Sequence, residues 1–352
     1  LVGSEMCIRD RNRSGAGALV LCTILFCLCA CTEDASYTAG VWYRRSDFDG
    51  VARTDAVGFT IGNKGYICGG YNGKTTRLAD TWEYDIDNDW WTQRADMPGT
   101  VRNAATGFPV GNKGYITTGY NPDQKYLADT WEYDPETNTW RQMDDFKGGA
   151  RYYALGFGID NYGYVGTGYN DNYLKDFYRF DPTAAAGSQW TIVNGFGGQK
   201  RQGATAFVIN GKAYVCGGQN NNSDVSDFWR FDPSAATPWT QLRDIANTSD
   251  DDYDDDYTSI VRSYGVSFVI DGKAYLTLGS TAGGSYYSNY WIYDPETDLW
   301  EGDDLTAFEG STRIHAVCFS TGTRGIIATG GSGSSSYFDD TWELKPYEYE
   351  EE

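Results

Sequence analysis

Six copies of one pattern run through this chain of 352 residues, and they constrain its fold more than any other feature. Each copy starts at an arginine that precedes an apolar stretch, and consecutive arginines lie 49, 49, 50, 61 and 51 residues apart. A phenylalanine follows each arginine after six residues and a glycine after seventeen. The arginines are Arg53, Arg102, Arg151, Arg201, Arg262 and Arg313. Such a period predicts a repeat architecture in which each unit packs against its neighbours.

Each complete copy has the pattern of four short strands. In the first copy an apolar strand follows Arg53, and a glycine turn at 62–65 leads to a second strand. A third strand begins at Thr81, and a Tyr-Asp turn leads to a fourth strand at Trp91. Aromatic residues make up 16% of the chain and there are 43 glycines, a combination that favours strands joined by tight turns. The sequence therefore predicts an all-β fold, a β-propeller with six blades.

The last copy lacks its fourth strand, and the missing strand is found at the other end of the chain. The segment 41–50, which contains Trp42, is similar to the segment 91–99. We therefore expect an N-terminal strand to complete the last blade, which would close the ring without an open sheet edge. The expected propeller covers 41–346 and is followed by an acidic tail at 347–352. The expected blades are about 51–100, 101–149, 150–199, 200–247, 258–309 and 310–346 plus 41–50.

The landmarks of each copy resemble those of a known family. Paired glycines such as Gly69-Gly70, a Tyr-Asp-Pro turn such as 133–135 and a tryptophan such as Trp140 recur with the period of the repeat. This combination resembles the Kelch-repeat β-propellers. The resemblance implies the fold over nearly the whole chain, but it says little about function, because one fold hosts many functions.

The first residues have the pattern of processing signals. The stretch Met6–Asp10 resembles a translated sequencing adapter, and we therefore expect residues 1–11 to be a sequence artefact. The apolar run from Ala16 to Ala30 follows two arginines and is too short to span a bilayer. It suits the apolar region of a signal peptide, which we expect at 12–31.

The end of this apolar run resembles the lipobox of bacterial lipoproteins. It reads Leu28-Cys29-Ala30-Cys31, which implies lipidation at Cys31 and a linker at 32–40. An ordinary signal peptide or a membrane anchor is the alternative. Acidic residues follow Cys31, as in surface lipoproteins of Bacteroidetes. The resemblance implies an outer-membrane lipoprotein of the bacterial cell envelope, periplasmic or surface-exposed, that contacts the membrane through its lipid alone.

Composition excludes several classes of function. The net charge is −21, and an acidic surface repels the phosphates of nucleic acids, so we expect no nucleic-acid partner. His315 is the only histidine. A copper site of the galactose-oxidase type or a histidine-rich zinc site needs more than one histidine. The sequence contains no phosphate-binding loop and no dinucleotide motif.

Topology places the candidate ligand site at one mouth of the central channel. In a four-stranded antiparallel blade, the loop between the second and third strands lies on the same face as the start of the first strand. These loops are rich in Tyr, Asn, Ser and Gly, which are adaptable recognition residues, although such residues are also common in any loop. The loops are Tyr71–Arg77, Tyr120–Tyr126, Tyr169–Tyr173, Gln219–Ser223, Ser280–Tyr287 and Gly331–Tyr337.

The six arginines at this mouth have two possible roles. They can attract a carboxylate or phosphate, and related Kelch propellers hold acidic peptides with arginines at this position. Alternatively, each arginine pairs with the residue that opens the third strand of its own blade. Sixfold repetition favours the structural role. The residues that open the third strands are Asp80, Asp129, Asp176, Asp227, Asn289 and Asp340.

The position two residues after each arginine varies, and variation inside a regular frame indicates where specificity lies. Its occupants include Asp55, Tyr153, Tyr264 and His315, which we predict to contact a ligand together with the arginines. For His315 a satisfied structural role is the alternative. The other two occupants are Ala104 and Gly203.

The long interval between the fourth and fifth arginines contains an acidic insertion. Its six aspartates could bind Ca²⁺ through carboxylate oxygens, but they lack the frame of an EF-hand loop. A solvated acidic loop is the simpler interpretation, and we expect no other cofactor. The aspartates are Asp250, Asp251, Asp252, Asp254, Asp255 and Asp256.

Taken together, these features favour a monomeric, non-catalytic propeller that binds a protein, a peptide or a glycan through this face. The alternative is a carbohydrate-active enzyme, because bacterial Kelch propellers include a sialic-acid mutarotase. Asp55 would then be the clearest acid–base candidate. A third possibility is an architectural subunit recognised through its rim.

Overall fold

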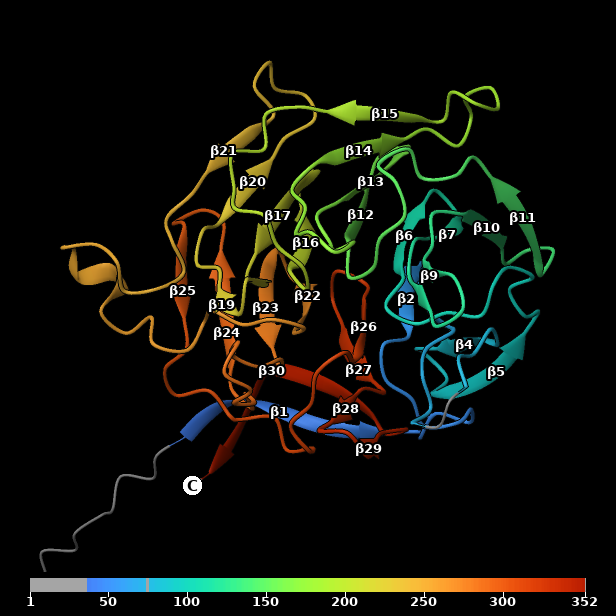
Figure 1. Ribbon diagram of the computed structural model, residues 1–352. Coiled ribbons are helices and arrows are strands. Elements are labelled where there is room, and N and C mark those ends of the chain that lie inside the picture. Colours follow the sequence, from blue (N-terminus) through green and yellow to red (C-terminus); the bar gives the residue numbers. More distant parts are fainter. Residues whose placement is uncertain (1–36, 74–75, 352) are drawn as a thin grey trace, which may run out of the picture. The chain divides into compact units, whose positions relative to one another are not determined.

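The computed structural model describes residues 37–73 and 76–351. Within these residues six four-stranded antiparallel sheets surround one axis, as Figure 1 shows. The chain is therefore a six-bladed β-propeller, as the repeats predict. In blades one to five the strands follow one another outward from the axis in chain order.

The strands of each blade have the following bounds. Blade one contains β2 (Val57–Ile61), β3 (Lys64–Cys68), β4 (Thr81–Asp85) and β5 (Trp90–Arg94). Blade two contains β6 (Thr106–Val110), β7 (Lys113–Thr117), β10 (Thr130–Asp134) and β11 (Thr139–Met143). Blade three contains β12 (Leu155–Ile159), β13 (Tyr162–Gly166), β14 (Phe177–Phe180) and β15 (Trp190–Val193). Blade four contains β16 (Thr205–Ile209), β17 (Lys212–Cys216), β20 (Trp229–Phe231) and β21 (Trp239–Gln241). Blade five contains β22 (Val266–Ile270), β23 (Lys273–Thr277), β24 (Tyr290–Asp294) and β25 (Leu299–Glu301). Blade six contains β26 (Val317–Ser320), β27 (Gly325–Ala328), β30 (Thr341–Glu351) and β1 (Tyr37–Arg45).

Short hairpins and one helical turn complete the described structure. The hairpins lie between the second and third strands of blades two, four and six. They are β8 (Tyr120–Asn121) with β9 (Lys125–Tyr126), β18 (Gln219–Asn220) with β19 (Ser223–Asp224), and β28 (Gly331–Ser332) with β29 (Ser336–Tyr337). The 3₁₀ turn η1 (Asp252–Asp254) lies in the acidic insertion.

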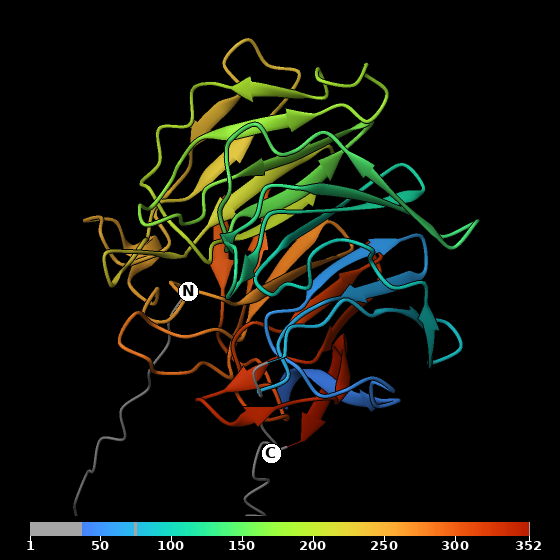
Figure 2. The ribbon, with the colours of Figure 1, turned by 45° about the vertical axis from the view of Figure 1, so that its right-hand side comes forward.

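The N-terminal strand β1 closes the ring. It pairs antiparallel with β30, with Trp42 opposite Leu344, and in Figures 1 and 2 the blue strand lies beside the red strands of blade six. This confirms the predicted completion of the last blade. The strands are longer than expected, because β1 begins at Tyr37 and β30 continues to Glu351. The stretch expected to form an acidic tail is thus the end of β30.

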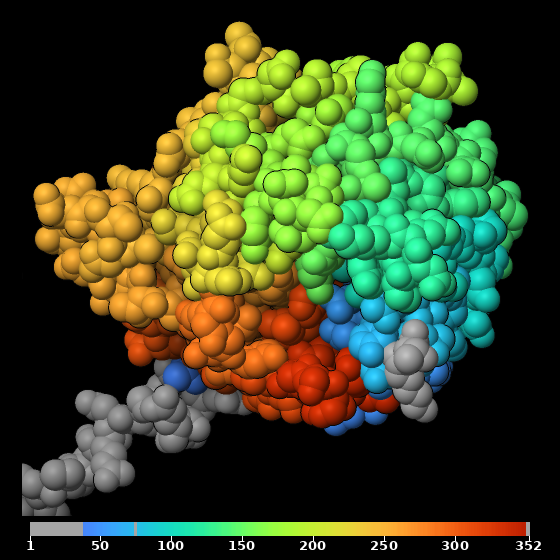
Figure 3. All heavy atoms as spheres, viewed as in Figure 1, coloured from blue at the N-terminus to red at the C-terminus, as the bar shows by residue number. Residues whose placement is uncertain are grey.

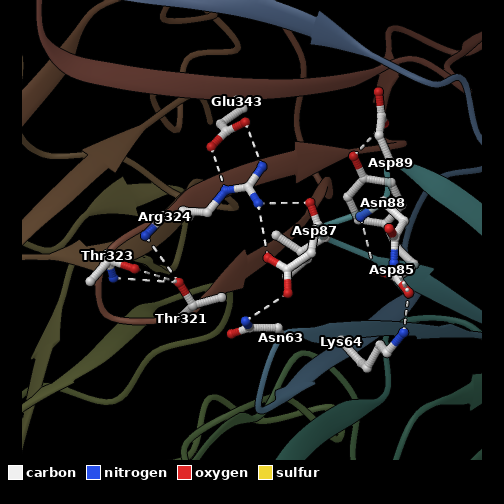
Figure 4. A network of polar contacts seen from close by, with 12 residues as sticks. Asn63, Lys64, Asp85, Asp87, Asn88, Asp89, Thr321, Thr323, Arg324 and Glu343 are labelled. Carbon is white, nitrogen blue, oxygen red and sulfur yellow. Dashed lines mark hydrogen bonds and ion pairs between the residues drawn. The ribbon is translucent and has the colours of Figure 1, made fainter.

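A polar network joins blade six to blade one, as Figure 4 shows. Arg324, in the turn before β27, donates from Nε and Nη2 to Glu343 of β30 at 2.6 and 2.8 Å. Its Nη1 also donates to the carbonyl of Ile86 in blade one at 2.7 Å. The last blade is therefore bound to the first by side chains as well as by packing.

Aromatic side chains fill the spaces between blades. Phe59 on β2 stacks on Tyr66 of β3 with ring centroids 5.2 Å apart, and Tyr66 meets Tyr133 of blade two at 5.6 Å. Such contacts contribute about 0.5–1.5 kcal/mol each beyond the area they bury. All the tryptophans except Trp90 occupy a repeat position. Trp90 is 57% exposed, whereas its neighbour Trp91, at a repeat position, is buried.

The predicted artefact, the signal peptide and the lipidated Cys31 lie outside the described residues. A search of the described part of the chain for a helix long and apolar enough to cross a membrane gives no candidate.

Candidate ligand site at the loop-bearing face

All six repeated arginines are buried, with at most 1% of their surface exposed. Arg53 shows the arrangement: Nη1 and Nη2 donate to the two carboxylate oxygens of Asp80 at 2.7 Å each. Nη1 also donates to the carbonyl of Gly69 at 3.0 Å, and Nε donates to the carbonyl of Val51 at 2.9 Å. The corresponding pairs are Arg102–Asp129, Arg151–Asp176, Arg201–Asp227 and Arg313–Asp340.

These contacts match the structural role, in which each arginine pairs with the residue that opens the third strand of its own blade. Burial alone would raise the pKa of Asp80, but the hydrogen bonds and the charge of Arg53 hold it below its usual value. A buried ion pair keeps both charges only when the remaining donors are also satisfied, as they are here. The guanidinium groups therefore lie inside the blades, not on the surface of the mouth where we predicted them to meet a ligand. That surface is formed by the residues that follow each arginine.

Blade five departs from this pattern. Arg262 has no carboxylate partner among the described residues. Its Nη2 donates to Asn289 Oδ1 at 3.2 Å and to the carbonyl of Ser259 at 2.6 Å. Burial lowers the pKa of Arg262 to about 10, because no anion compensates its charge.

The residues two positions after the arginines form the innermost layer of the mouth. Their φ angles lie between 50° and 63°, a left-handed conformation that is uncommon for residues other than glycine. The N–H of Ala104 donates to the carbonyl of Asp55 at 2.9 Å, and the N–H of Tyr153 donates to the carbonyl of Ala104 at 3.0 Å. This pattern continues through Gly203, Tyr264 and His315 and returns to Asp55. A closed ring of backbone hydrogen bonds therefore encircles the axis.

Four of the predicted site residues meet in this layer. Asp55 accepts a hydrogen bond from the hydroxyl of Tyr153 at 2.7 Å, and its Oδ1 lies 2.8 Å from Nδ1 of His315. The His315 ring is 4.4 Å from the ring of Tyr264 and 5.0 Å from that of Tyr153. A cavity of about 180 Å³ lies at this cluster. The structure thus brings together residues from blades one, three, five and six.

Asp55 is the charged centre of this cluster. Burial alone would raise its pKa, but the charge and hydrogen bond of His315, with hydrogen bonds from Tyr153 and Asn103, hold it below its usual value. Burial and the Asp55 charge raise the pKa of Tyr153, so its hydroxyl remains a donor at neutral pH. The mouth therefore combines a fixed carboxylate with an imidazole and two phenol groups.

A surface of half-buried tyrosines borders this cluster over blades two and three. Tyr152 stacks on Tyr126 with ring centroids 5.6 Å apart, and it meets Tyr120 at 5.7 Å and Tyr169 at 5.8 Å. Tyr152 also contacts Tyr153 of the inner layer at 4.9 Å. We call these four residues, Tyr120, Tyr126, Tyr152 and Tyr169, the tyrosine surface.

The sequence analysis missed Tyr152, although it found the loops around it. Tyr152 follows the repeated arginine directly, and the backbone at this position bridges the first residue of the neighbouring loop, as in Tyr152 with Tyr169. This position varies among the six copies just as the next one does, and that variation was the available signal. Its occupants are Thr54, Asn103, Tyr152, Gln202, Ser263 and Ile314.

The acidic insertion projects from the rim, at the left edge of Figure 3. Only one of its six aspartates, Asp254, is buried. Asp254 accepts hydrogen bonds from the backbone N–H groups of Thr248 and Ser249, both at 2.9 Å, and so holds the loop together. No group of three or more His, Cys, Asp or Glu side chains suited to a metal is found in residues 37–73 and 76–351.

Known proteins resemble this chain in sequence and in fold. The Kelch motif matches residues 52–98, 110–147 and 200–241. The N-acetylneuraminate epimerases of Yersinia pestis (strain Pestoides F) and Yersinia pseudotuberculosis serotype O:1b (strain IP 31758) are each 29% identical over 164 residues. These alignments cover 38% of this chain and 41% of each relative, so the chain spans less than half the length of the curated relatives it matches.

A solved structure, that of YjhT, shares the fold. It matches with a TM-score of 0.69 at 15% identity, over 84% of this chain and 95% of that chain. The three matched motifs and the closed ring of six blades together show that this protein is a Kelch-type β-propeller.

Proposed function

We propose that this propeller is a non-catalytic binding protein of the bacterial envelope that holds a glycan against the tyrosine surface. The observation that carries the proposal is the contiguous set of half-buried aromatic faces beside the Asp55 cluster. Tyrosine offers flat amphipathic area at low entropic cost, and its hydroxyl adds a hydrogen bond. The faces of sugar rings need both kinds of contact.

The electrostatics of this face support a polar, uncharged or weakly acidic ligand. Five of the six repeated arginines are paired with aspartates inside the blades, and Asp55 places a carboxylate at the mouth. Arg77 places a cation at the loops, with its guanidinium 4.2 Å from the ring centre of Tyr71 and 5.6 Å from that of Tyr120, whereas the neighbouring Lys125 is paired with Asp171. A ligand carboxylate that reaches Arg77 would therefore gain a charge-assisted contact.

The test is a calorimetric titration of the purified protein with neutral oligosaccharides, N-acetylneuraminate and acidic peptides. We expect a glycan to bind, and Tyr152→Ala to weaken it at least tenfold. Tyr286→Ala serves as the matched control, because Tyr286 lies in a blade-five loop outside the tyrosine surface. Binding of peptides alone, or equal affinity in the two variants, would contradict the proposal.

The second candidate is an enzyme that interconverts the anomers of an acidic sugar. The local similarity to N-acetylneuraminate epimerases favours it, as does the contact between Asp55 and His315 at the mouth. A carboxylate and an imidazole in contact can move protons during opening and closing of a sugar ring. Anomer exchange of N-acetylneuraminate, followed by NMR, distinguishes the two functions. The enzyme predicts exchange that Asp55→Asn abolishes, whereas the binding protein predicts exchange at the uncatalysed rate.

A further inference from the structure

The position three residues after the partner of the repeated arginine carries opposite charges in different blades. It is Glu83 in blade one, Glu132 in blade two and Glu343 in blade six, but it is Arg179 in blade three and Arg230 in blade four. In blade three this position faces a cleft that is shared with blade four. Blades with glutamate and blades with arginine at this position can therefore be compared to see what fills the space between two blades.

In the blades with glutamate, a carboxylate occupies the crevice with its partners in place. Glu83 accepts hydrogen bonds from the hydroxyl of Tyr66 at 2.9 Å and from Nη2 of Arg94 at 2.7 Å. Glu343, which is fully buried, accepts from Arg324 (Figure 4). In each of these blades the carboxylate is thus bound by at least one cation, and in blades one and two a tyrosine hydroxyl also donates to it.

In blade three Arg179 stands at the position that glutamate occupies in blades one, two and six. Arg179 lies opposite Tyr164 on β13 and Thr191 on β15, and its guanidinium lies 4.5 Å from the centre of the Tyr162 ring. The Nε atom of Arg179 is buried and has no hydrogen-bond partner in the described part of the chain. Asp181 does not fill the gap, because its carboxylate accepts from the N–H and the hydroxyl of Thr183 at 2.9 and 2.7 Å. A buried donor without an acceptor is unfavourable.

The space beside Arg179 is open. A cleft of about 380 Å³ lies between blades three and four, and its wall combines Arg179 and two hydroxyl groups with apolar side chains. Ile192 in this wall is 56% exposed, although it is a large apolar residue. A cleft of this size suits a small molecule. The lining residues include Tyr164, Thr191, Phe231 and Pro238.

We propose that this cleft, which we call the Arg179 cleft, binds a small organic carboxylate with an apolar body. The ligand carboxylate lies in the cleft beside Arg179 and accepts from its guanidinium, which has no carboxylate partner among the described residues of blade three. The apolar body of the ligand covers Ile192 and Pro238. This site is independent of the tyrosine surface, so either proposal can fail without the other.

The experiment is a titration of the full chain with hexanoate and with benzoate, observed by ligand NMR in 0.15 M NaCl. Hexanamide and benzamide are the neutral controls. We expect the acids to bind at least tenfold more tightly than the amides, and Arg179→Gln to remove this preference. Arg230→Gln is the matched variant at the equivalent position in blade four. The Nε atom of Arg230 is also buried without a hydrogen-bond partner among the described residues, but Arg230 does not line the cleft, so we expect its substitution to change nothing. Failure of both acids to bind the wild type would overturn the proposal.

A second pair of variants keeps the test valid if Arg179→Gln does not fold. Ile192 is exposed, so its substitution leaves the fold intact. Ile192→Asp places a negative charge at the cleft and should weaken the acids at least tenfold relative to Ile192→Asn, which has the same size without the charge. Equal affinities of these two variants for hexanoate would show that the acids bind elsewhere.

Discussion

Replacing Asn289 by aspartate should stabilise the protein, because Arg262 is the repeated arginine that lacks a carboxylate partner. The pKa of Arg262 falls from 12.5 to about 10 through burial. This difference corresponds to about 3 kcal/mol of unfavourable burial of the charge below pH 10. The site accepts the change, since the other five blades carry aspartate at the same position, and the indole of Trp291 could then donate to the carboxylate as Trp82 does to Asp80.

The expected gain is about 1–3 kcal/mol, because desolvation of the new carboxylate offsets part of the favourable pairing. The sign of its pH dependence follows from the pKa of the new carboxyl. Like Asp80, this carboxyl should have a folded-state pKa below its usual value. The gain is therefore fully present above about pH 4–5 and is lost as the pH falls through the lowered pKa.

The assay is urea denaturation of wild type and Asn289→Asp at pH 7 and at pH 3. Asp80→Asn is the reverse change in blade one, and it should cost about 3–5 kcal/mol because it leaves Arg53 without its anion. Suppose Asn289→Asp were neutral or destabilising at pH 7 while Asp80→Asn were strongly destabilising. The carbonyl partners of Arg262 would then already compensate its charge, and the reasoning would be refuted.

Three further predictions concern the fold. In thermal denaturation, Trp91→Ala should cost about 3–5 kcal/mol of stability, whereas Trp90→Ser, at a 57% exposed residue, should change it by less than about 0.5 kcal/mol. Gly114→Ala should cost about 1–3 kcal/mol in urea denaturation, because the added Cβ would lie 2.0 Å from the Phe59 ring of the preceding blade. Burial would raise the pKa of Glu343, but Arg324 and two further cations lower it to about 2, so its contribution is present above pH 4.5 and is lost as the pH falls through about 2. Acid titration of the wild type and Glu343→Gln should therefore show a stability difference that narrows below pH 4.5.

The repeat predicted the architecture because each landmark has one structural task in every blade. The arginine, the glycine seventeen residues after it and the tryptophan recur because the blades share the same buried arginine, the same turn and the same filling between sheets. Blade five alone has asparagine in place of the aspartate partner. Gly70 illustrates the shared turn, because its φ of 103° and the carbonyl of Thr54, 3.0 Å from where a Cβ would lie, leave no room for another residue. Even the closure by Trp42 followed from counting the landmarks.

The candidate site was only partly predictable. Asp55 and His315 were found from their variation, but their contact joins the neighbouring blades one and six, whose residues lie far apart in sequence. Tyr152 was missed because the interpretation considered the repeated Arg151 and the position two residues after it, but not the residue between them. The Arg179 cleft has no sequence motif at all. It is recognised only when the equivalent residues of different blades are compared in the folded structure.

The most direct test of the proposed function is saturation-transfer NMR with the glycan that binds most tightly in calorimetry. We expect transfer from the protein to the C–H groups of the sugar in the wild type and in Arg179→Gln. We expect loss of that transfer in Tyr152→Ala, with the fold intact by circular dichroism. Undiminished transfer in Tyr152→Ala, or no transfer in the wild type, would contradict the claim that the tyrosine surface holds the ligand.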